Sequence, residues 1–200
     1  MDHIKVIEIK KSVFEDNDRD ADLLRAELKE KGVFLLNLMS SPGSGKTSTL
    51  IQLISRLKQR LRIAVMEADI DSDVDAVKIR EATGIETIQL HTGGMCHLDA
   101  DMSRQGFKEF CTSADVVFLE NIGNLVCPAE FDTGAHLKMA LLAVPEGDDK
   151  PLKYTLMFST CDVVVVTKTD TAKYFDFDLE KCKKYIAKIN PNAKVFAVSS

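Results

Sequence analysis

The sequence predicts a doubly wound α/β domain, with a mostly parallel sheet of about seven strands and helices on both faces. Short apolar runs alternate with helical patterns along most of the chain. Runs such as DVVFLE and DVVVVT are apolar on both faces of the strand, as expected for a parallel sheet that helices cover on both sides. A glycine-rich turn, SSPGSGKT, separates the first of these strands from a helical pattern. Together these three observations indicate the fold class.

The first 32 residues are expected to form a helical arm, because Leu23, Leu24 and Leu28 recur at helical spacing within 15–31 and Gly32 follows. Residues 33–200 are expected to form one domain. Its predicted strands span residues 33–39, 62–67, 86–90, 115–120, 137–144, 162–167 and 194–198. Its predicted helices span residues 47–61, 75–83, 98–112 and 179–189.

Composition argues against several classes of partner. The 200 residues include 26 Lys and Arg against 31 Asp and Glu, a net charge of −5, so nucleic acid and anionic membranes are not expected partners. No apolar run is long enough to cross a bilayer. Five cysteines without the spacing of a disulfide framework favour a reducing compartment. We therefore expect a cytoplasmic protein.

The turn SSPGSGKT has the features of a phosphate-binding loop. Glycines let successive backbone N–H groups converge on phosphate oxygens, and the N-terminus of the following helix adds partial positive charge. We expect the lysine to reach the β- and γ-phosphates and to act in catalysis, and the threonine to bind magnesium. The predicted nucleotide-binding residues are Gly43, Ser44, Gly45, Lys46, Thr47 and Ser48, with Ser40 in place of the usual first glycine.

The segment VVVVTKTD resembles the Asn-Lys-x-Asp signature of GTP-binding proteins and predicts that the base is guanine. Lys168 and Asp170 are the predicted base-binding residues. The Asp170 carboxylate would accept hydrogen bonds from guanine N1 and the exocyclic amine, a donor pair that adenine does not offer. Thr167 stands where the signature has Asn, so one contact of the base pocket is expected to differ.

Acidic residues after two predicted strands suggest a magnesium site. Glu120 ends a strand, and Gly123 follows at a position where a backbone N–H can sense a γ-phosphate. The segment MEADIDSDVDA adds several aspartates after the second strand of the domain, of which Asp71 and Asp73 are expected to be helix caps or solvated charges. The predicted magnesium ligands are Thr47, Asp69, Asp75 and Glu120, and the predicted catalytic residues are Lys46, Asp75 and Glu120.

Two loops that follow predicted strands carry ligands for a softer metal. They contain Cys96 with His97, and Cys127. The spacing alone also fits a buried thiol beside a helix-capping imidazole. However, both loops belong to the carboxyl edge of the sheet, where the nucleotide is expected. One chain offers three ligands, and a two-fold dimer would offer six. The other three cysteines, Cys111, Cys161 and Cys182, and two of the histidines, His91 and His136, are expected to be structural.

Four segments together resemble the HypB family of hydrogenase nickel-incorporation GTPases. They are SSPGSGKT, HTGGMCHLDA, FLENIGNLVCPAEFD and VPEGDDKPLKY, and the likeness covers the chain from about Val33. The resemblance implies a GTP-hydrolysing metallochaperone of the P-loop class that uses GTP/GDP and magnesium and assists nickel insertion into [NiFe]-hydrogenase. It also implies a nucleotide-dependent homodimer, a HypA-type zinc/nickel accessory protein and the hydrogenase large subunit as partners. Nickel or zinc would bind to Cys96, His97 and Cys127 at the dimer interface.

The resemblance also carries departures and one further expectation. Relatives commonly have Gly at the position of Ala68. They continue beyond the position of Ser200 into a loop over the guanine and a closing helix, so that helix is expected to be absent from this chain. The segment 146–154 would lie near the nucleotide and the subunit interface, with Lys150 or Lys153 reaching across.

Other functions remain open at this point. A urease-type nickel accessory GTPase would carry Cys-Pro-His, whereas His97 directly follows Cys96 here. A phosphotransferase would need an arginine-rich lid, and Arg80 and Arg104 are too scattered to supply one. A GTP-dependent scaffold without metal delivery is the third alternative. Because no strong general base is evident, slow intrinsic hydrolysis is expected of a switch.

Overall fold

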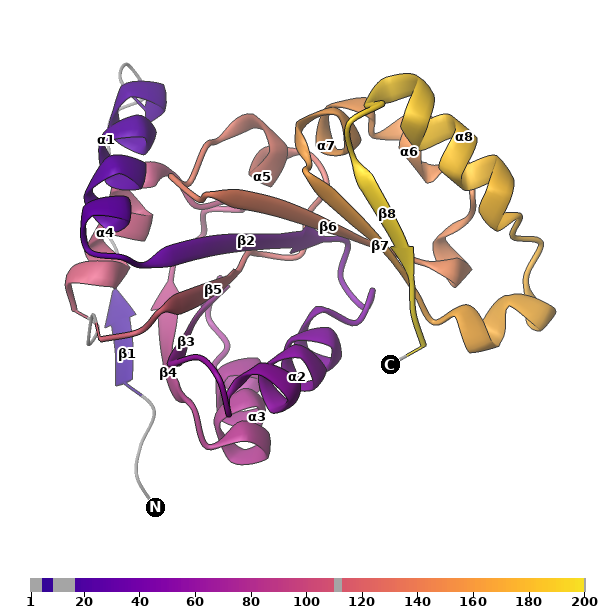
Figure 1. Cartoon of the computed structure of the whole chain (residues 1–200). Helices are drawn as coiled ribbons and strands as arrows, with labels where there is room; N and C mark the ends of the chain where they lie inside the picture. The colour runs from indigo at the N-terminus through magenta and orange to yellow at the C-terminus, as the bar shows by residue number, and fades with distance from the viewer. Residues whose placement is uncertain (1–4, 9–16, 110–112, 200) are drawn as a thin grey trace.

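The computed structural model describes residues 5–8, 17–109 and 113–199 and contains one continuous sheet (Figure 1). The sheet has eight strands, all parallel, in the order β1-β4-β3-β5-β2-β6-β7-β8. The strands are β1 Lys5–Glu8, β2 Phe34–Ser40, β3 Ile63–Asp69, β4 Glu86–His91, β5 Val116–Glu120, β6 Leu137–Ala143, β7 Val163–Thr167 and β8 Lys194–Ala197. All seven predicted strands are present, so the predicted fold class is confirmed.

The eighth strand corrects the predicted strand number. Strand β1 lies within the first 32 residues, which were expected to be helical, and pairs with β4 at the edge of the sheet. Its four residues, KVIE, are too few for alternation to distinguish a strand from a loop. The first 32 residues therefore contribute both a strand and a helix.

The helices are α1 Asn17–Glu30, α2 Lys46–Leu57, α3 Val74–Thr83, α4 Ala100–Lys108, α5 Cys127–Glu130, α6 Lys150–Lys153, α7 Thr155–Thr160 and α8 Leu179–Ile189, with 3₁₀ turns at Val144–Glu146 and Thr169–Tyr174. The five long helices match predicted ones. Helix α2 ends four residues earlier than the predicted 47–61. Helix α4 ends at Lys108, and the end of the predicted 98–112, including Cys111, lies outside the described residues. The sequence prediction missed α5, α6 and α7, which have too few residues to show helical periodicity.

Helices cover both faces of the sheet (Figure 1). Leu35 and Met39 of β2 point to one face, where α1 and α4 cover one half and α7 and α8 the other. Leu36 and Leu38 point to the opposite face, against α2 and α3. Because both sets are buried, the continuous apolar run of β2 matches its place in the middle of the sheet.

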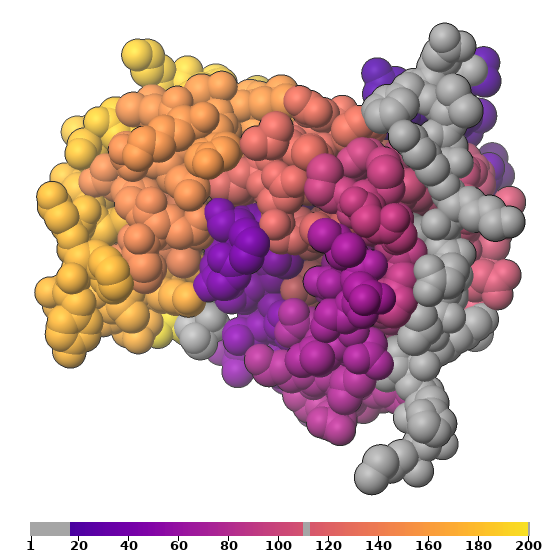
Figure 2. All heavy atoms as spheres, turned by 180° about the vertical axis from the view of Figure 1, so that it is seen from behind, coloured from indigo at the N-terminus to yellow at the C-terminus, as the bar shows by residue number. Residues whose placement is uncertain are grey.

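The order of the strands in the sheet reverses at β2, and this reversal positions the functional loops. Strands β3, β4 and β5 lie on one side of β2, and β6, β7 and β8 lie on the other. Ligands of open parallel sheets bind at the carboxyl ends of the strands, where the strand order reverses. In Figure 2 the violet segment after β2 lies between the orange and yellow C-terminal part and the magenta segments after β3 and β4. Within the described residues, no helix has the length and apolar character that a bilayer crossing requires.

Helix α1 is anchored to the segment that connects α5 with β6. Arg25 donates to both carboxylate oxygens of Asp132, at 3.0 and 2.9 Å, and to the carbonyl of Ala135. Gly134 has φ +75°, and its Cα lies so close to Leu24 that an added Cβ would be 2.9 Å from Leu24 Cδ2. Burial would raise the pKa of Asp132, but Lys138, the Gly134 N–H and Arg25 hold it below its usual range.

We expect Gly134→Ala to destabilise the protein by about 1–3 kcal/mol, because the new methyl group would both clash with Leu24 and occupy a left-handed backbone conformation. The free energy of unfolding in urea measures the effect. Gly32→Ala is the matched control, since Gly32 has φ +69° but open space around its Cβ position. Equal losses in the two variants would show that the contact with α1 contributes nothing.

Candidate functional site

The segment between β2 and α2 forms an open backbone cradle. Gly43 and Gly45 have φ of +74° and +95°, and no atom of the described residues lies within 4 Å of a Cβ built on either. Both the left-handed conformation and the clear space suit a backbone that approaches a phosphate chain closely. The buried Ser44 hydroxyl donates to Ser40 Oγ inside the loop. The serine at the usual first glycine position thus takes part in holding the loop.

Helix α2 begins at Lys46, directly after Gly45, as expected of a phosphate-binding loop. Lys46 and Ser48 are half-buried in its first turn, and Thr47 is buried. Among the hydrogen-bond partners described, the Thr47 hydroxyl donates to Glu120 Oε1 at 3.1 Å. The structure therefore brings the predicted phosphate-binding and magnesium-binding residues of β2–α2 and β5 together.

The end of β7 is tied directly to this cradle. The buried Thr167 hydroxyl donates to the carbonyl of Ser44 at 2.7 Å. Lys168, which has φ +57°, donates from Nζ to the carbonyl of Gly43 at 2.6 Å. Thr167 therefore makes a specific contact at the position where the guanine-binding signature has Asn. A non-glycine residue in the left-handed region is uncommon, and here it directs the Lys168 side chain back over the phosphate loop.

Asp170 follows in the 3₁₀ turn after β7. It is exposed, and one carboxylate oxygen accepts a hydrogen bond from the Ser199 hydroxyl at 2.8 Å. The backbone joins the same two segments, since Thr169 N donates to the carbonyl of Val198 at 3.2 Å. The carboxylate that is predicted to read the base is thus held at the surface by the residues after β8.

Three carboxylates meet beside Thr47. Each of Glu67, Asp75 and Glu120 offers an oxygen, and these oxygens lie within 4.8 Å of one another. Glu67 and Glu120 are directly paired across β3 and β5, and both are almost fully buried. Among the residues that the structure describes, Glu67 Oε2 and Glu120 Oε2 have no hydrogen-bond partner. Two buried oxygens without partners beside a third carboxylate and a hydroxyl are a donor set that fits magnesium.

The protonation of this group reflects its burial. Desolvation, followed by the charge of Glu120, raises the pKa of Glu67 to about 9. Desolvation likewise raises the pKa of Glu120 to about 7, against the opposing effect of Lys46. A bound cation would reverse both effects by stabilising the charged carboxylates.

The sequence prediction named Asp69 as a magnesium ligand and missed Glu67. In the structure, Glu67 joins Asp75 and Glu120, and Asp69 does not. Asp69 Oδ1 accepts hydrogen bonds from the backbone N–H groups of Asp71 and Ser72, so this carboxylate holds its own loop. It is not a member of the three-carboxylate group. Glu67 lies inside a strand whose residues before it are all apolar and buried, and that was the available signal: a charged residue in a buried strand needs a partner.

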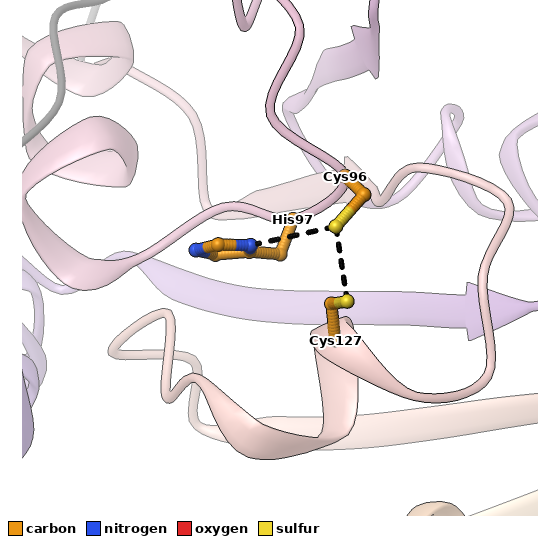
Figure 3. A group of neighbouring side chains, drawn as sticks. All are labelled: Cys96, His97 and Cys127. Carbon is orange, nitrogen blue, oxygen red and sulfur yellow. Dashed lines mark hydrogen bonds between the residues drawn. The ribbon is translucent and has the colours of Figure 1, made fainter.

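The predicted soft-metal ligands also come together (Figure 3). Cys96 Sγ lies 2.9 Å from Cys127 Sγ and 3.9 Å from His97 Nδ1. Hydrogen bonding to Cys127, together with partial burial, raises the pKa of Cys96. A metal that binds to the thiolates of Cys96 and Cys127 would therefore displace their protons. Cys161 and Cys182 are buried in the core beneath α7 and α8, as predicted.

The imidazole of this group is firmly held. His97 is buried and stacks on Phe131, with ring centroids 3.7 Å apart and planes 10° from parallel. Cys127 begins the short helix α5, and its loop is linked to Cys96 because Asn124 donates to the carbonyl of Cys96 at 3.4 Å. By contrast, His136 bonds Leu35 N and stacks on Phe34, a structural role as predicted.

A single loop connects the cluster of three carboxylates with the cluster of Cys96, His97 and Cys127. It runs from Glu120 at the end of β5 to Cys127, and Gly123 lies in its middle. A Cβ on Gly123 would be 3.1 Å from Pro42 Cγ and 3.2 Å from Pro42 Cα. The loop with one soft-metal ligand therefore packs directly against the phosphate loop.

The segment 146–154 also contacts the phosphate loop. Ser41 donates from Oγ to Glu146 Oε2 at 2.5 Å, and Glu146 forms an ion pair with Lys150 at 3.5 Å. Lys153 instead pairs with Asp149 at 2.6 Å. The expectation that this segment lies near the nucleotide site agrees with these contacts, and a reach across a subunit interface stays a prediction.

Comparison with known proteins identifies the family. Residues 34–197 match the family described as CobW/HypB/UreG, nucleotide-binding domain. The hydrogenase maturation factor HypB of Azotobacter chroococcum mcd 1 is 44% identical over 197 residues, which cover 98% of this chain but 64% of that relative. HypB of Escherichia coli K12 is 41% identical over 201 residues, covering 100% of this chain and 69% of that protein. The chain thus spans about two thirds of the length of these relatives.

Solved structures agree with the sequence comparison. A crystal structure of HypB from Helicobacter pylori in complex with nickel has a TM-score of 0.85 at 37% identity, covering 92% of this chain and 86% of that one. HypB from Archaeoglobus fulgidus has a TM-score of 0.85 at 35% identity, covering 93% and 91%. The resemblance inferred from the sequence is confirmed, and the chain belongs to the CobW/HypB/UreG family and, within it, to the HypB hydrogenase maturation factors.

Proposed function

We propose that this protein is a GTP-hydrolysing metallochaperone of the cytoplasm that assists nickel insertion into [NiFe]-hydrogenase. One observation carries the proposal: the loop from Glu120 to Cys127 contacts the phosphate loop through Gly123 and supplies a thiol to the Cys96–His97 pair. A change at the phosphates can thereby reach a soft-metal site. The names of relatives support the cargo, since one HypB crystallised with nickel.

The nucleotide would bind across the carboxyl edge of the sheet. The Gly43–Gly45 backbone and the N-terminus of α2 would hold the phosphates, Lys46 would reach the β- and γ-phosphates, and Asp170 would read guanine. Thr47, Glu120, Asp75 and Glu67 would hold magnesium, which neutralises charge on the phosphates during hydrolysis. Because no strong general base lies in this group, hydrolysis is expected to be slow, and rapid multiple turnover without partners would contradict a switch.

Metal delivery would follow from movement of the shared loop. A γ-phosphate near Gly123 would shift the segment that packs on Pro42, and Cys127 lies four residues further along it. Hydrolysis would remove that contact and change the distance between Cys127 and the Cys96–His97 pair. Nickel favours nitrogen and sulfur ligands of this kind, so altered geometry would favour its release.

A second copy of the chain would complete the metal site. Three ligand atoms from one chain leave coordination positions open, and a symmetric dimer doubles the set to six. Val126, next to Cys127, is 48% exposed, so the residue beside this ligand is accessible to a partner. GTP-dependent homodimerisation, a HypA-type accessory protein and the hydrogenase large subunit as recipient are parts of the same proposal.

The other functions have less support. A urease-type accessory GTPase shares the family, but here His97 is adjacent to Cys96, and the relatives named above are hydrogenase maturation factors. In the described chain, Arg104 is committed to an ion pair with Glu27, so it does not supply a phosphotransferase lid. A scaffold without metal delivery would not need the three ligand atoms to converge.

Asp170→Asn is expected to weaken GTP binding by roughly 10–100-fold, the worth of a hydrogen bond to a charged group. The same variant should gain affinity for xanthosine triphosphate, because the Asn amide can donate to the oxygen that replaces the exocyclic amine. Fluorescent-nucleotide competition measures both. Asp176→Asn, an exposed neighbour in the same segment, is the control and should bind GTP as the wild type does. Unchanged base preference in Asp170→Asn would refute the assignment.

Stability without magnesium is expected to fall as the pH rises. Glu67 keeps its proton up to about pH 9 when folded and loses it near its ordinary pKa of 4.5 when unfolded, so the folded state binds more protons in between. We expect the free energy of unfolding in urea and a chelator to be lower at pH 8.5 than at pH 6, by about 3 kcal/mol from Glu67. Glu67→Gln should lose most of this difference. A wild type equally stable at both pH values would contradict the buried, protonated state.

A nickel titration tests the proposed function itself. GTP-loaded protein is expected to develop a thiolate-to-nickel charge-transfer band and to double its mass in solution, whereas Cys96→Ser and Cys127→Ser should lose the band. Cys182→Ala is the matched control, because this thiol is a buried residue of α8 that faces the core. A wild type that forms no band with GTP would leave the scaffold function as the better explanation.

A further inference from the structure

The side chain of Asn17 bridges the two loops that carry the soft-metal ligands. Its Oδ1 accepts a hydrogen bond from the backbone N–H of Ala100 at 2.9 Å. Its Nδ2 donates to the backbone carbonyl of Asp132 at 3.1 Å. Ala100 and Asp132 are far apart in the sequence, and one amide group holds them at a defined separation.

Both bridged positions are close to the ligand set along the chain. Ala100 lies three residues after His97, and Asp132 directly follows Phe131, on which the His97 ring stacks. Asp132 is also five residues after Cys127, just beyond the end of α5. By joining Ala100 to Asp132, Asn17 therefore sets the distance between two loops. One loop carries Cys96 and His97, and the other carries Cys127 and Phe131.

Asn17 is itself held in place by the rest of α1. Leu24 and Leu28 are buried in the core against the sheet, and Arg25 is bound to Asp132 through both carboxylate oxygens. A bridging side chain can hold two loops only when its own backbone is fixed, and these contacts fix it.

A second amide also links the two segments that carry the ligands. Asn124 donates to the carbonyl of Cys96, and its Oδ1 accepts from Val126 N at 2.8 Å, next to Cys127. Asn124 belongs to the loop that follows β5, which contacts the phosphate loop. Asn17 lies in α1, outside both loops that carry the ligands. One bridge can therefore change with the nucleotide while the other serves as a fixed reference.

We infer that Asn17 is a positioning residue for the nickel site, which sets the distance between the two ligand loops so that Cys96, His97 and Cys127 converge. The inference rests on the proposed metal-binding function of these residues. Outer groups that orient metal ligands commonly contribute 10–100-fold to metal affinity. Asn17 touches no ligand atom itself, and its effect passes through the backbone of Ala100 and Asp132.

The alternative role of Asn17 is to satisfy a free N–H at the start of α4. That role needs only an acceptor, and Asp is as good an acceptor at a helix N-terminus as Asn. A bridge needs an acceptor and a donor, and Asp has no donor when ionised. Asn17→Asp therefore separates the two roles: it rescues a cap and does not rescue a bridge.

The test measures nickel affinity of the GTP-loaded protein by competition with a chromophoric chelator, together with the charge-transfer spectrum. Asn17→Ala and Asn17→Asp are both expected to bind nickel about 10–100-fold more weakly, with an altered charge-transfer band. GTP affinity and the urea midpoint report whether each variant folds. Glu27→Ala, which removes a different contact of α1, should bind nickel as the wild type does.

The outcomes are separable. Wild-type nickel affinity in Asn17→Ala, or full recovery of affinity and spectrum in Asn17→Asp, would overturn the inference and leave the proposed function intact. An equal loss in Glu27→Ala would also overturn it, because the effect would belong to helix α1 as a whole. A wild type that binds no nickel would overturn both the inference and the proposed function.

Discussion

The parallel pairing of β2 with β5 is the constraint on which the rest of the site depends. It aligns Leu38 with Glu120, so that the phosphate loop after β2 and the loop after β5 leave the sheet side by side. Thr47 then reaches Glu120, and Gly123 packs against Pro42. Neither contact could form if the two strands ran in opposite directions, because their carboxyl ends would then lie at opposite edges.

Further strands bring other parts of the site to the same edge. Strand β4 ends before the loop of Cys96 and His97, and β7 ends at Thr167, which bonds the phosphate loop. Adjacent parallel strands thus gather groups that are distant in the sequence without any element being specific to metal or nucleotide. Helix α1 adds the one element from outside this order, and it fixes the spacing of the metal loops through Asn17.

The sequence predicted the sheet and the ligand types better than it predicted particular partners. Buried parallel strands are apolar throughout, so DVVFLE and DVVVVT were recognisable, whereas β1 and the helices α5–α7 were too short to show a period. Cys96, His97 and Cys127 were found because few other residue types bind soft metals. Glu67 was missed because its importance comes from its register opposite Glu120, and a single sequence does not reveal strand register.

The loop from Glu120 to Cys127 carries a hard ligand at its start and a soft one at its end. Buried carboxylates and a hydroxyl suit magnesium, while thiols and an imidazole suit nickel or zinc. Seven positions along one loop therefore separate the two proposed metal sites, which differ in the chemistry of their donors. In the proposed function, this difference would direct each ion to its own ligands although no structural element lies between the two sites. A movement of the loop would then link the occupancy of one site to the geometry of the other.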